Sequence, residues 1–237
     1  MRSLTQRQPA DIRRLVPGSV KLGYHALLRG ASTVIDRALG VETATRVDLA
    51  EYGLAHVERV NYEAGGWLDL PRVLRRERVT GEDVLLDLGC GKGRALLMAS
   101  RHRFARVVGV ELAPALARVC RRNLESFRLP RRCGAVEVVV ADAADYAIPD
   151  DVTVVYLFNP FRGGLFDSVV RNILASVDRR PRRLRLIYRN AIYADRLLAT
   201  GRARLVRSAP GLRPTRRWRE AVAVRVYAIE PARAPAA

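Results

Sequence analysis

The feature that most restricts the fold of this sequence is an alternation of short apolar runs with helical patterns from residue 83 onward. Strand-like runs occupy 83–88, 106–111, 135–142, 152–158, 182–190, 202–209 and 221–230. Strands that alternate with helices form parallel sheets, and nearly continuous apolar strands are typical of a sheet buried on both faces. The last two runs have no helical pattern between them, so we expect them to pair antiparallel. The sequence therefore predicts an α/β fold with a seven-stranded, mostly parallel sheet, an antiparallel last strand and helices on both faces.

Composition divides the chain into four parts. The first residues are polar and basic with two prolines, and residues that follow them carry apolar positions at helical spacing over 26–39, 48–60 and 70–79. Gly65-Gly66 interrupts this helical region. We expect a flexible N-terminus over 1–20, a helical cap over 21–80, the α/β domain over 81–230 and a flexible tail over 231–237.

The net charge of +18 admits two interpretations. A basic surface attracts nucleic acid or acidic partners. However, Lys21 and Lys92 are the only lysines among 42 basic residues, and the arginines are spread along the whole chain. This bias favours the coding preference of a GC-rich, bacterial genome, and it leaves a role in nucleic-acid binding open.

The remaining composition argues for a cytoplasmic protein without a membrane or metal partner. The sequence contains no apolar run long enough to cross a bilayer and no signal-peptide pattern at its start. Its three cysteines, Cys90, Cys120 and Cys133, lack the Cys-x-x-Cys spacing of zinc sites. We therefore expect reduced cysteines, and no metal site is predicted.

A glycine-rich turn, "DLGCGKGR" over 87–94, follows the first strand and opens onto a helical pattern. Gly89, Gly91 and Gly93 allow the backbone to turn sharply and to approach a ligand. In α/β sheets, ligands bind at the carboxyl ends of the strands. A tight strand-to-helix connection without a ligand is the competing interpretation.

Two acidic residues end the following strands and strengthen the ligand interpretation. Glu111 stands where an acid accepts hydrogen bonds from ribose hydroxyls, and the Asp142 carboxylate is placed to accept from an adenine amine. A dinucleotide fingerprint requires glycine at the position of Arg94, and a Walker loop requires Ser or Thr after Lys92. Neither motif is present.

These motifs, "DLGCGKG", "GVE", "ADAADY" and "LFNPF" in this order, resemble those of class I S-adenosylmethionine-dependent methyltransferases over about residues 60–230. The resemblance implies a Rossmann-like sheet, a methyltransferase activity and S-adenosylmethionine as the cofactor. In it, Asp87 and the glycine turn hold the methionine part, Glu111 holds the ribose, and Asp142 and Ala143 flank the adenine. The residues implied in cofactor binding are Asp87, Gly89, Cys90, Gly91, Gly93, Glu111, Leu112, Asp142, Ala143 and Asn159.

The layout is also similar to that of the non-SET histone-lysine methyltransferases. Those enzymes have a Tyr-x-Glu loop that closes over the cofactor just before the sheet, and Tyr62-Glu63 occupies the corresponding place in this chain. The similarity implies a shared scaffold and not a shared substrate. Tyr62 is therefore a candidate lid and catalytic residue, with packing against the cap as the alternative.

The fourth strand leads into Asn159-Pro160-Phe161, the predicted catalytic turn. Amino-methylating members of the superfamily have Asp/Asn-Pro-Pro-Tyr/Phe there. The Asn159 amide oxygen and a neighbouring carbonyl are suited to accept hydrogen bonds from an amine, and Phe161 is suited to form an aromatic wall. An ordinary turn out of a buried strand is the alternative.

We therefore predict N-methylation of an amine on a small molecule or a single side chain, because a helical cap suits a desolvated acceptor. Three alternatives stay open. The first is an RNA- or protein-directed methyltransferase that uses the basic surface. The others are an enzyme of the same fold that uses S-adenosylmethionine for another reaction and a catalytically silent binding subunit.

Overall fold

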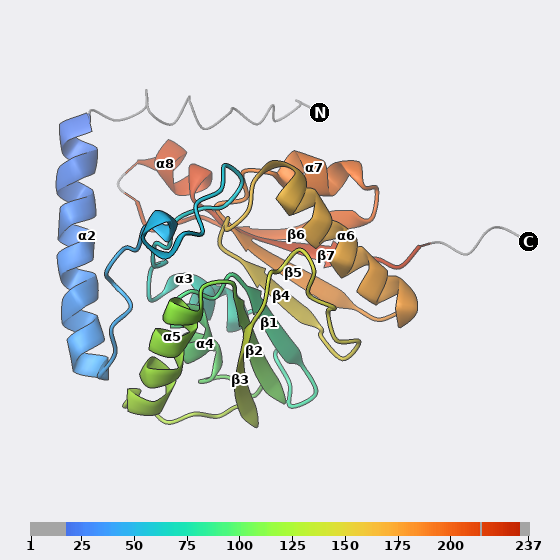
Figure 1. The fold of residues 1–237 in the computed structure, drawn as a ribbon. Coiled ribbons are helices and arrows are strands. Elements are labelled where there is room, and N and C mark those ends of the chain that lie inside the picture. Colours follow the sequence, from blue (N-terminus) through green and yellow to red (C-terminus); the bar gives the residue numbers. More distant parts are fainter. Residues whose placement is uncertain (1–17, 214, 233–237) are drawn as a thin grey trace, which may run out of the picture.

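The computed structural model describes residues 18–213 and 215–232, and a seven-stranded sheet forms its centre (Figure 1). The strand order is β3-β2-β1-β4-β5-β7-β6. The strands are β1 (Val84–Leu88), β2 (Arg106–Glu111), β3 (Ala135–Val140), β4 (Val154–Leu157), β5 (Leu184–Arg189), β6 (Ala203–Ala209) and β7 (Val224–Ile229). Strands β1 to β5 are parallel, and β7 pairs antiparallel with both β5 and β6. The predicted fold class is confirmed.

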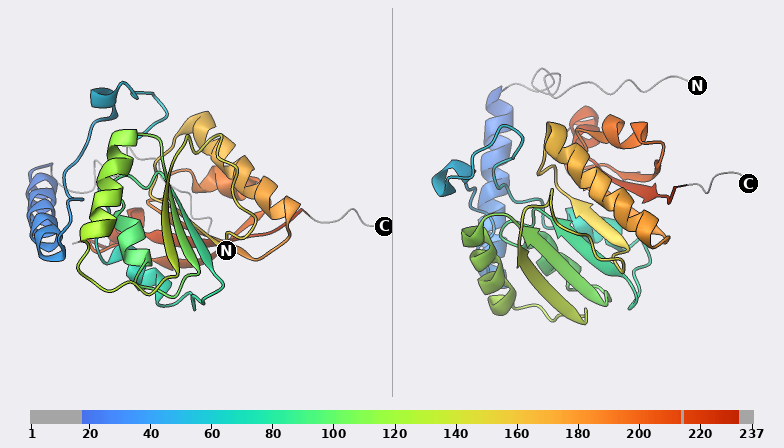
Figure 2. Two further views of the ribbon diagram at one scale, coloured as in Figure 1. Left: turned by 60° about the horizontal axis from the view of Figure 1, so that its bottom comes forward. Right: turned by 45° about the vertical axis from the view of Figure 1, so that its right-hand side comes forward.

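Helices cover both faces of the sheet (Figure 2). On one face, α3 (Asp69–Leu74), α4 (Arg94–Ala99) and α5 (Pro114–Ser126) share an apolar core with the sheet. On the other face, α6 (Gly163–Arg179) and α7 (Ala194–Ala199) share a second core. A short helix, α8 (Arg216–Ala221), precedes β7 in a segment where only a loop was expected.

The predicted cap contains one long helix, α2 (Gly18–Leu39), which stands at the side of the sheet domain (Figure 1). Its C-terminal end contacts the end of α5, where Arg128 donates to the carbonyls of Ala38 and Leu39. Residues 18–20 already belong to α2, so the predicted flexible N-terminus is too long by these residues. The remainder of that prediction, 1–17, and residues 233–237 of the predicted tail lie outside the described residues. Among the described helices, none is long and apolar enough to cross a membrane.

The helix predicted over 48–60 is wrong. Only a short 3-10 helix, η1 (Leu49–Tyr52), forms there, with Asp48 accepting from the Ala50 N–H and Gly53 ending it at a φ of 68°. The chain then runs extended, and its backbone pairs at Arg59 with Phe161 and at Tyr62 with Val47. Pairing with distant segments satisfies these backbone groups in place of helical hydrogen bonds.

Candidate functional site

A cavity lies at the carboxyl ends of β1, β2 and β4, where the strand order changes direction between β1 and β4. The glycine turn, the ends of these strands and the extended segment 59–65 line it. The predicted site residues that line the cavity are Tyr62, Asp87, Gly89, Cys90, Gly91, Glu111, Leu112, Asp142, Ala143, Pro160 and Phe161. The structure therefore brings together most of the residues that the sequence singled out.

The glycine turn is fixed by backbone hydrogen bonds to the end of β2. The N–H groups of Gly89 and Cys90 donate to the Val110 carbonyl at 2.9 and 3.0 Å. Gly91 has a φ of 56°, and a Cβ there would lie 2.2 Å from the Tyr62 ring. A side chain at this position is therefore excluded both by backbone strain and by the close approach of Tyr62.

Gly93 differs from the other turn glycines in what it contacts. Its φ is 86°, and a Cβ there would lie 2.4 Å from the Cys120 sulfur of α5. Gly93 does not line the cavity among the described residues. The glycine therefore permits close packing of the turn on α5, and its predicted contact with a ligand stays a prediction.

Two buried carboxylates face the cavity and have no cationic partner within residues 18–213 and 215–232. Glu111 accepts hydrogen bonds from the N–H groups of Gly91 and Ala113 at 2.8 and 2.9 Å, while burial raises the pKa of its carboxyl. Asp87 is 2% exposed and accepts no hydrogen bond from a described residue. Burial, together with the nearby Glu111 charge, raises the pKa of Asp87 to about 8. Such a pair favours a ligand that carries positive charge.

The extended segment crosses the cavity as a strap, which we define as residues 56–65. The Val60 N–H donates to the Pro160 carbonyl at 3.2 Å, and the Arg59 guanidinium donates to Asp142 at 2.9 Å. Glu58 accepts hydrogen bonds from the N–H groups of Gly164 and Leu165 at 2.7 and 3.0 Å. The strap is therefore attached to the ends of β3 and β4 and to the start of α6.

The Glu58 carboxylate is expected to hold the strap closed. Hydrogen bonds from the Gly164 and Leu165 N–H groups lower its pKa, so this attachment is present above the ordinary value of 4.5 and is lost as the pH falls through the lowered value. Glu58→Ala should speed amide hydrogen exchange at Val60 and Leu165, measured by NMR. The control Glu51→Ala, at an exposed position of η1, should leave these rates unchanged. Equal rates in both variants would contradict the attachment.

Tyr62 lines the cavity with its ring, while its hydroxyl is engaged elsewhere. The hydroxyl donates to the Thr43 carbonyl at 2.8 Å, and burial raises the pKa of the phenol above its ordinary range. The ring packs against Gly91, and the Lys92 ammonium lies 5.6 Å from its centroid. In this geometry Tyr62 joins the strap to the glycine turn, and its catalytic role stays a prediction.

The predicted catalytic turn is divided between the cavity and the core. Pro160 and Phe161 line the cavity, and a Cβ at Gly89 would lie 2.8 Å from Pro160. Asn159 is buried with a φ of 46°, and its amide oxygen accepts from the Tyr188 hydroxyl at 3.4 Å. It is absent from the described cavity lining. The structure thus gives Asn159 a role in shaping the turn, and its roles in catalysis and cofactor binding stay predictions.

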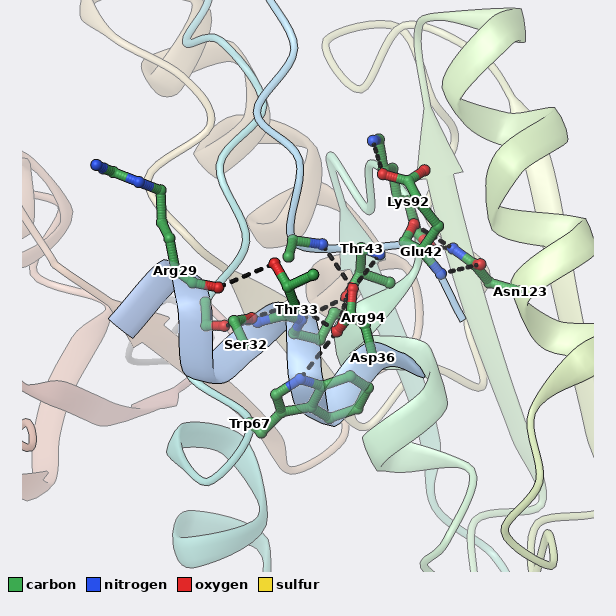
Figure 3. A network of polar contacts seen from close by, with 12 residues as sticks. Arg29, Ser32, Thr33, Asp36, Glu42, Thr43, Trp67, Lys92, Arg94 and Asn123 are labelled. Atoms are coloured by element: carbon green, nitrogen blue, oxygen red, sulfur yellow. Dashed lines mark hydrogen bonds and ion pairs between the residues drawn. The ribbon is translucent and has the colours of Figure 1, made fainter. Parts of the chain in front are cut away.

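A buried arginine that was not predicted from the sequence joins the cap to the sheet domain. Arg94 donates to the Thr43 hydroxyl at 2.7 Å, to the Gly65 carbonyl at 2.6 Å and to the Asp36 carboxylate at 3.0 Å (Figure 3). Its guanidinium lies 4.7 Å from the Trp67 ring. One side chain thus contacts α2, the loop after it and the strap.

Lys92 has a similar role. It is 4% exposed, and its ammonium donates to Glu42 of the cap at 2.6 Å (Figure 3). Neither basic residue of the turn is available to pair with an anionic ligand. The sequence does contain a sign that Arg94 is buried. Arg94 stands where the dinucleotide-binding motif has a glycine, and it begins a helix whose other residues are all apolar.

Comparison with known proteins yields a family match over about two thirds of the sheet domain. Residues 85–182 match the family model described as "Methyltransferase domain". A tRNA1(Val) (adenine(37)-N6)-methyltransferase of Shewanella amazonensis is 36% identical over 63 residues, 27% of each protein. A carboxy-S-adenosyl-L-methionine synthase of Salmonella arizonae is 33% identical over 89 residues, 36% of this chain and 35% of the synthase. The chain therefore covers only about a third or less of the length of these relatives.

Solved structures share the fold at low sequence identity. A SAM-dependent methyltransferase of Leishmania major is 14% identical with a TM-score of 0.50, over 69% of this chain and 72% of that one. The tRNA m1G37 methyltransferase of M. jannaschii is 12% identical with a TM-score of 0.51, over 71% of this chain and 51% of that one. These likenesses confirm the architecture of the sheet and its surrounding helices.

Proposed function

We propose that this chain is an S-adenosylmethionine-dependent methyltransferase that methylates an amine, on the basis of the methyltransferase-domain match over residues 85–182 and of the charges in the cavity. The observation that carries the proposal is the pair of buried carboxylates, Asp87 and Glu111, beside the glycine turn. S-adenosylmethionine carries a sulfonium and an ammonium group. Both positive charges suit a cavity whose buried acids have no cationic partner among the described residues.

The residues present fit the cofactor. Asp87 accepts no hydrogen bond from a described residue, so it is free to accept from the ammonium group. Each Glu111 oxygen accepts one backbone N–H and retains capacity for ribose hydroxyls. Leu112, Asp142 and Ala143 also line the cavity, and we assign Asp142 and Ala143 to the adenine. When bound, S-adenosylmethionine supplies an electrophilic methyl group on its sulfur.

The charges of the cavity favour an amine over an anionic acceptor. Arg59 is paired with Asp142, Arg94 with Asp36 and Lys92 with Glu42. A carboxylate or phosphate acceptor would find no unpaired cation among the lining residues that the structure describes. Aromatic walls from Tyr156, Phe158 and Phe161 suit an uncharged amine or a planar ring that bears one. The adenine-N6-methyltransferase among the relatives acts, by its name, on such a group.

The chain's contribution to the reaction is positioning and exclusion of water. The strap covers the cavity through its hydrogen bond to Pro160 and its ion pair with Asp142, and so separates the acceptor from solvent. Pro160 and Phe161 hold the acceptor against the glycine turn. Correct placement of two reactants supplies a large part of the rate enhancement in such transfers.

Cofactor affinity should depend on pH through Asp87. Its pKa of about 8 means that the free protein holds a proton there at neutral pH, which a bound cation displaces. Affinity for S-adenosylmethionine should therefore rise with pH up to about pH 8 and level off above it, and binding below that pH should release a proton. Calorimetric titration in two buffers of different ionisation enthalpy measures this release. Asp87→Asn should abolish it, the exposed control Asp145→Asn should not, and proton release that persists in Asp87→Asn would contradict the assignment.

The acceptor class is tested with a radiolabelled methyl group. We expect label transfer to primary or exocyclic amines, and none to carboxylic acids or alcohols of similar size. The main alternative is an enzyme that modifies S-adenosylmethionine itself, which the similarity to the carboxy-S-adenosyl-L-methionine synthase supports. Mass spectrometry of the nucleoside product distinguishes this reaction from methyl transfer. A modified cofactor in place of S-adenosylhomocysteine would show that the chain alters the cofactor itself. Cofactor binding without any product would identify a silent binding subunit.

A further inference from the structure

A group of arginines gathers at the edge of the sheet opposite the cavity. Strands β1, β2 and β3 begin at this edge. Backbone hydrogen bonds join the residues just before these strands: the Ala105 N–H donates to the Asp83 carbonyl, and the Gly134 N–H donates to the Phe104 carbonyl. The turn after α4 and the loop before β3 lie side by side there, joined by a bond from the Arg132 N–H to the Ser100 carbonyl at 2.7 Å. We define the edge arginine patch as Arg75, Arg101, Arg103, Arg128, Arg131 and Arg132.

The positive charge of the edge arginine patch is uncompensated. Among the residues that the structure describes, none of its members forms an ion pair, whereas Arg106, Arg179 and Arg202 pair with acids. The pKa of His102 reflects the positive potential at this edge. Burial lowers the pKa of its imidazole, and the charges of Arg75, Arg101 and Arg132 lower it further. Like charges are therefore held together at this edge without a neutralising partner.

We propose that the edge arginine patch binds the phosphate backbone of a nucleic acid. Guanidinium groups bind phosphates through paired hydrogen bonds, and several exposed arginines along one edge match a polymer with a charge on every residue. A membrane surface fits less well, because the loop exposes one large apolar side chain, Leu129 at 37%, and insertion into a bilayer requires more. The proposal does not depend on methyl transfer, since the patch lies at the opposite edge from the cavity.

The test removes three patch charges without removing hydrogen bonds. Arg75, Arg103 and Arg132 are exposed, and their side chains make no hydrogen bond to a described residue, so all three are changed to glutamine. The matched control is Arg171, Arg180 and Arg183 to glutamine, which removes the same charge from α6 and the turn after it. Binding of labelled single-stranded RNA and DNA of about 20 nucleotides is measured by fluorescence anisotropy from about 50 to 200 mM salt.

The patch variant should weaken binding at least about tenfold and reduce the slope of log K against log salt by about 2, since each single-strand contact contributes about 0.7. The control variant should change Kd by less than about threefold. These changes in binding to either RNA or DNA support the proposal, and the nucleic acid with the lower Kd is identified as the partner. Equal losses in both variants would overturn the proposal, as would a wild-type chain that binds phosphatidylserine vesicles but neither nucleic acid.

Two further measurements guard against a trivial loss of structure. The His102 pKa, followed by NMR, should rise in the patch variant because two of its repelling charges are removed. Affinity for S-adenosylmethionine should be unchanged, because the cavity lies at the other edge. Failure of nucleic-acid binding with intact cofactor binding would overturn this inference alone and leave the proposed methyltransferase function standing.

Discussion

Arg94→Ala is expected to lower the free energy of unfolding by about 3–5 kcal/mol. The substitution leaves the buried Asp36 carboxylate without its cation, and it removes the donors to Thr43 and Gly65. An uncompensated buried charge is far more costly than the loss of an exposed ion pair. Urea unfolding followed by circular dichroism measures the change.

The matched control for Arg94→Ala is Arg118→Ala, on the exposed surface of α5, which should stay within about 0.5 kcal/mol of the wild type. Arg94→Lys separates charge from shape. It retains the cation beside Asp36 but loses the planar fork, so it should fall between the wild type and the alanine variant. A loss below about 1 kcal/mol in Arg94→Ala would show that the cap does not depend on this residue.

Glu111→Ala should weaken S-adenosylmethionine binding by about 1–3 kcal/mol, or about 5- to 150-fold. The Glu111 carboxylate fixes the Gly91 and Ala113 N–H groups, and its remaining lone pairs face the cavity. Its removal therefore affects both the glycine turn and the ribose contact. Calorimetric titration measures the affinity, and the exposed Glu125→Ala of α5 is the control.

Glu111→Gln distinguishes the two effects. The amide keeps the length of the side chain and one acceptor oxygen, so it can retain one of the two backbone hydrogen bonds of the turn while the charge is lost. An affinity in Glu111→Gln close to that of the alanine variant would assign the effect to charge-assisted hydrogen bonds with the cofactor. Wild-type affinity in both variants would remove Glu111 from the site.

The sheet was predictable because its strands are defined by local pattern. Each of the seven apolar runs contains an observed strand, and the ends of β1, β2 and β3 place Asp87, Glu111 and Asp142 at one edge, as parallel strands require. The glycine turn was recognisable for the same reason, since positive φ angles at Gly89, Gly91 and Gly93 demand that residue type.

The cap was predicted less well because contacts with distant residues override local preference there. Residues 48–60 have apolar residues at helical spacing, yet only Leu49–Tyr52 form a short 3-10 helix, and residues 56–60 belong to the strap, whose backbone pairs with the segment after β4. Asn159 similarly has the residue type of an acceptor-binding side chain, but its φ of 46° and the contact with Tyr188 direct it into the core.

The sequence by itself determined the positions of the strands along the chain, the glycine turn and the acids at the ends of β1, β2 and β3, because these depend on periodicity and residue type along a short stretch of chain. Only the tertiary structure decided what the charges do. Arg94 and Lys92 are withdrawn from the ligand by partners 58 and 50 residues away, while the arginines around His102 form no ion pair with any acid that the structure describes. The reason is physical: the state of a charged side chain depends on its burial and its neighbours in space, and local sequence specifies neither.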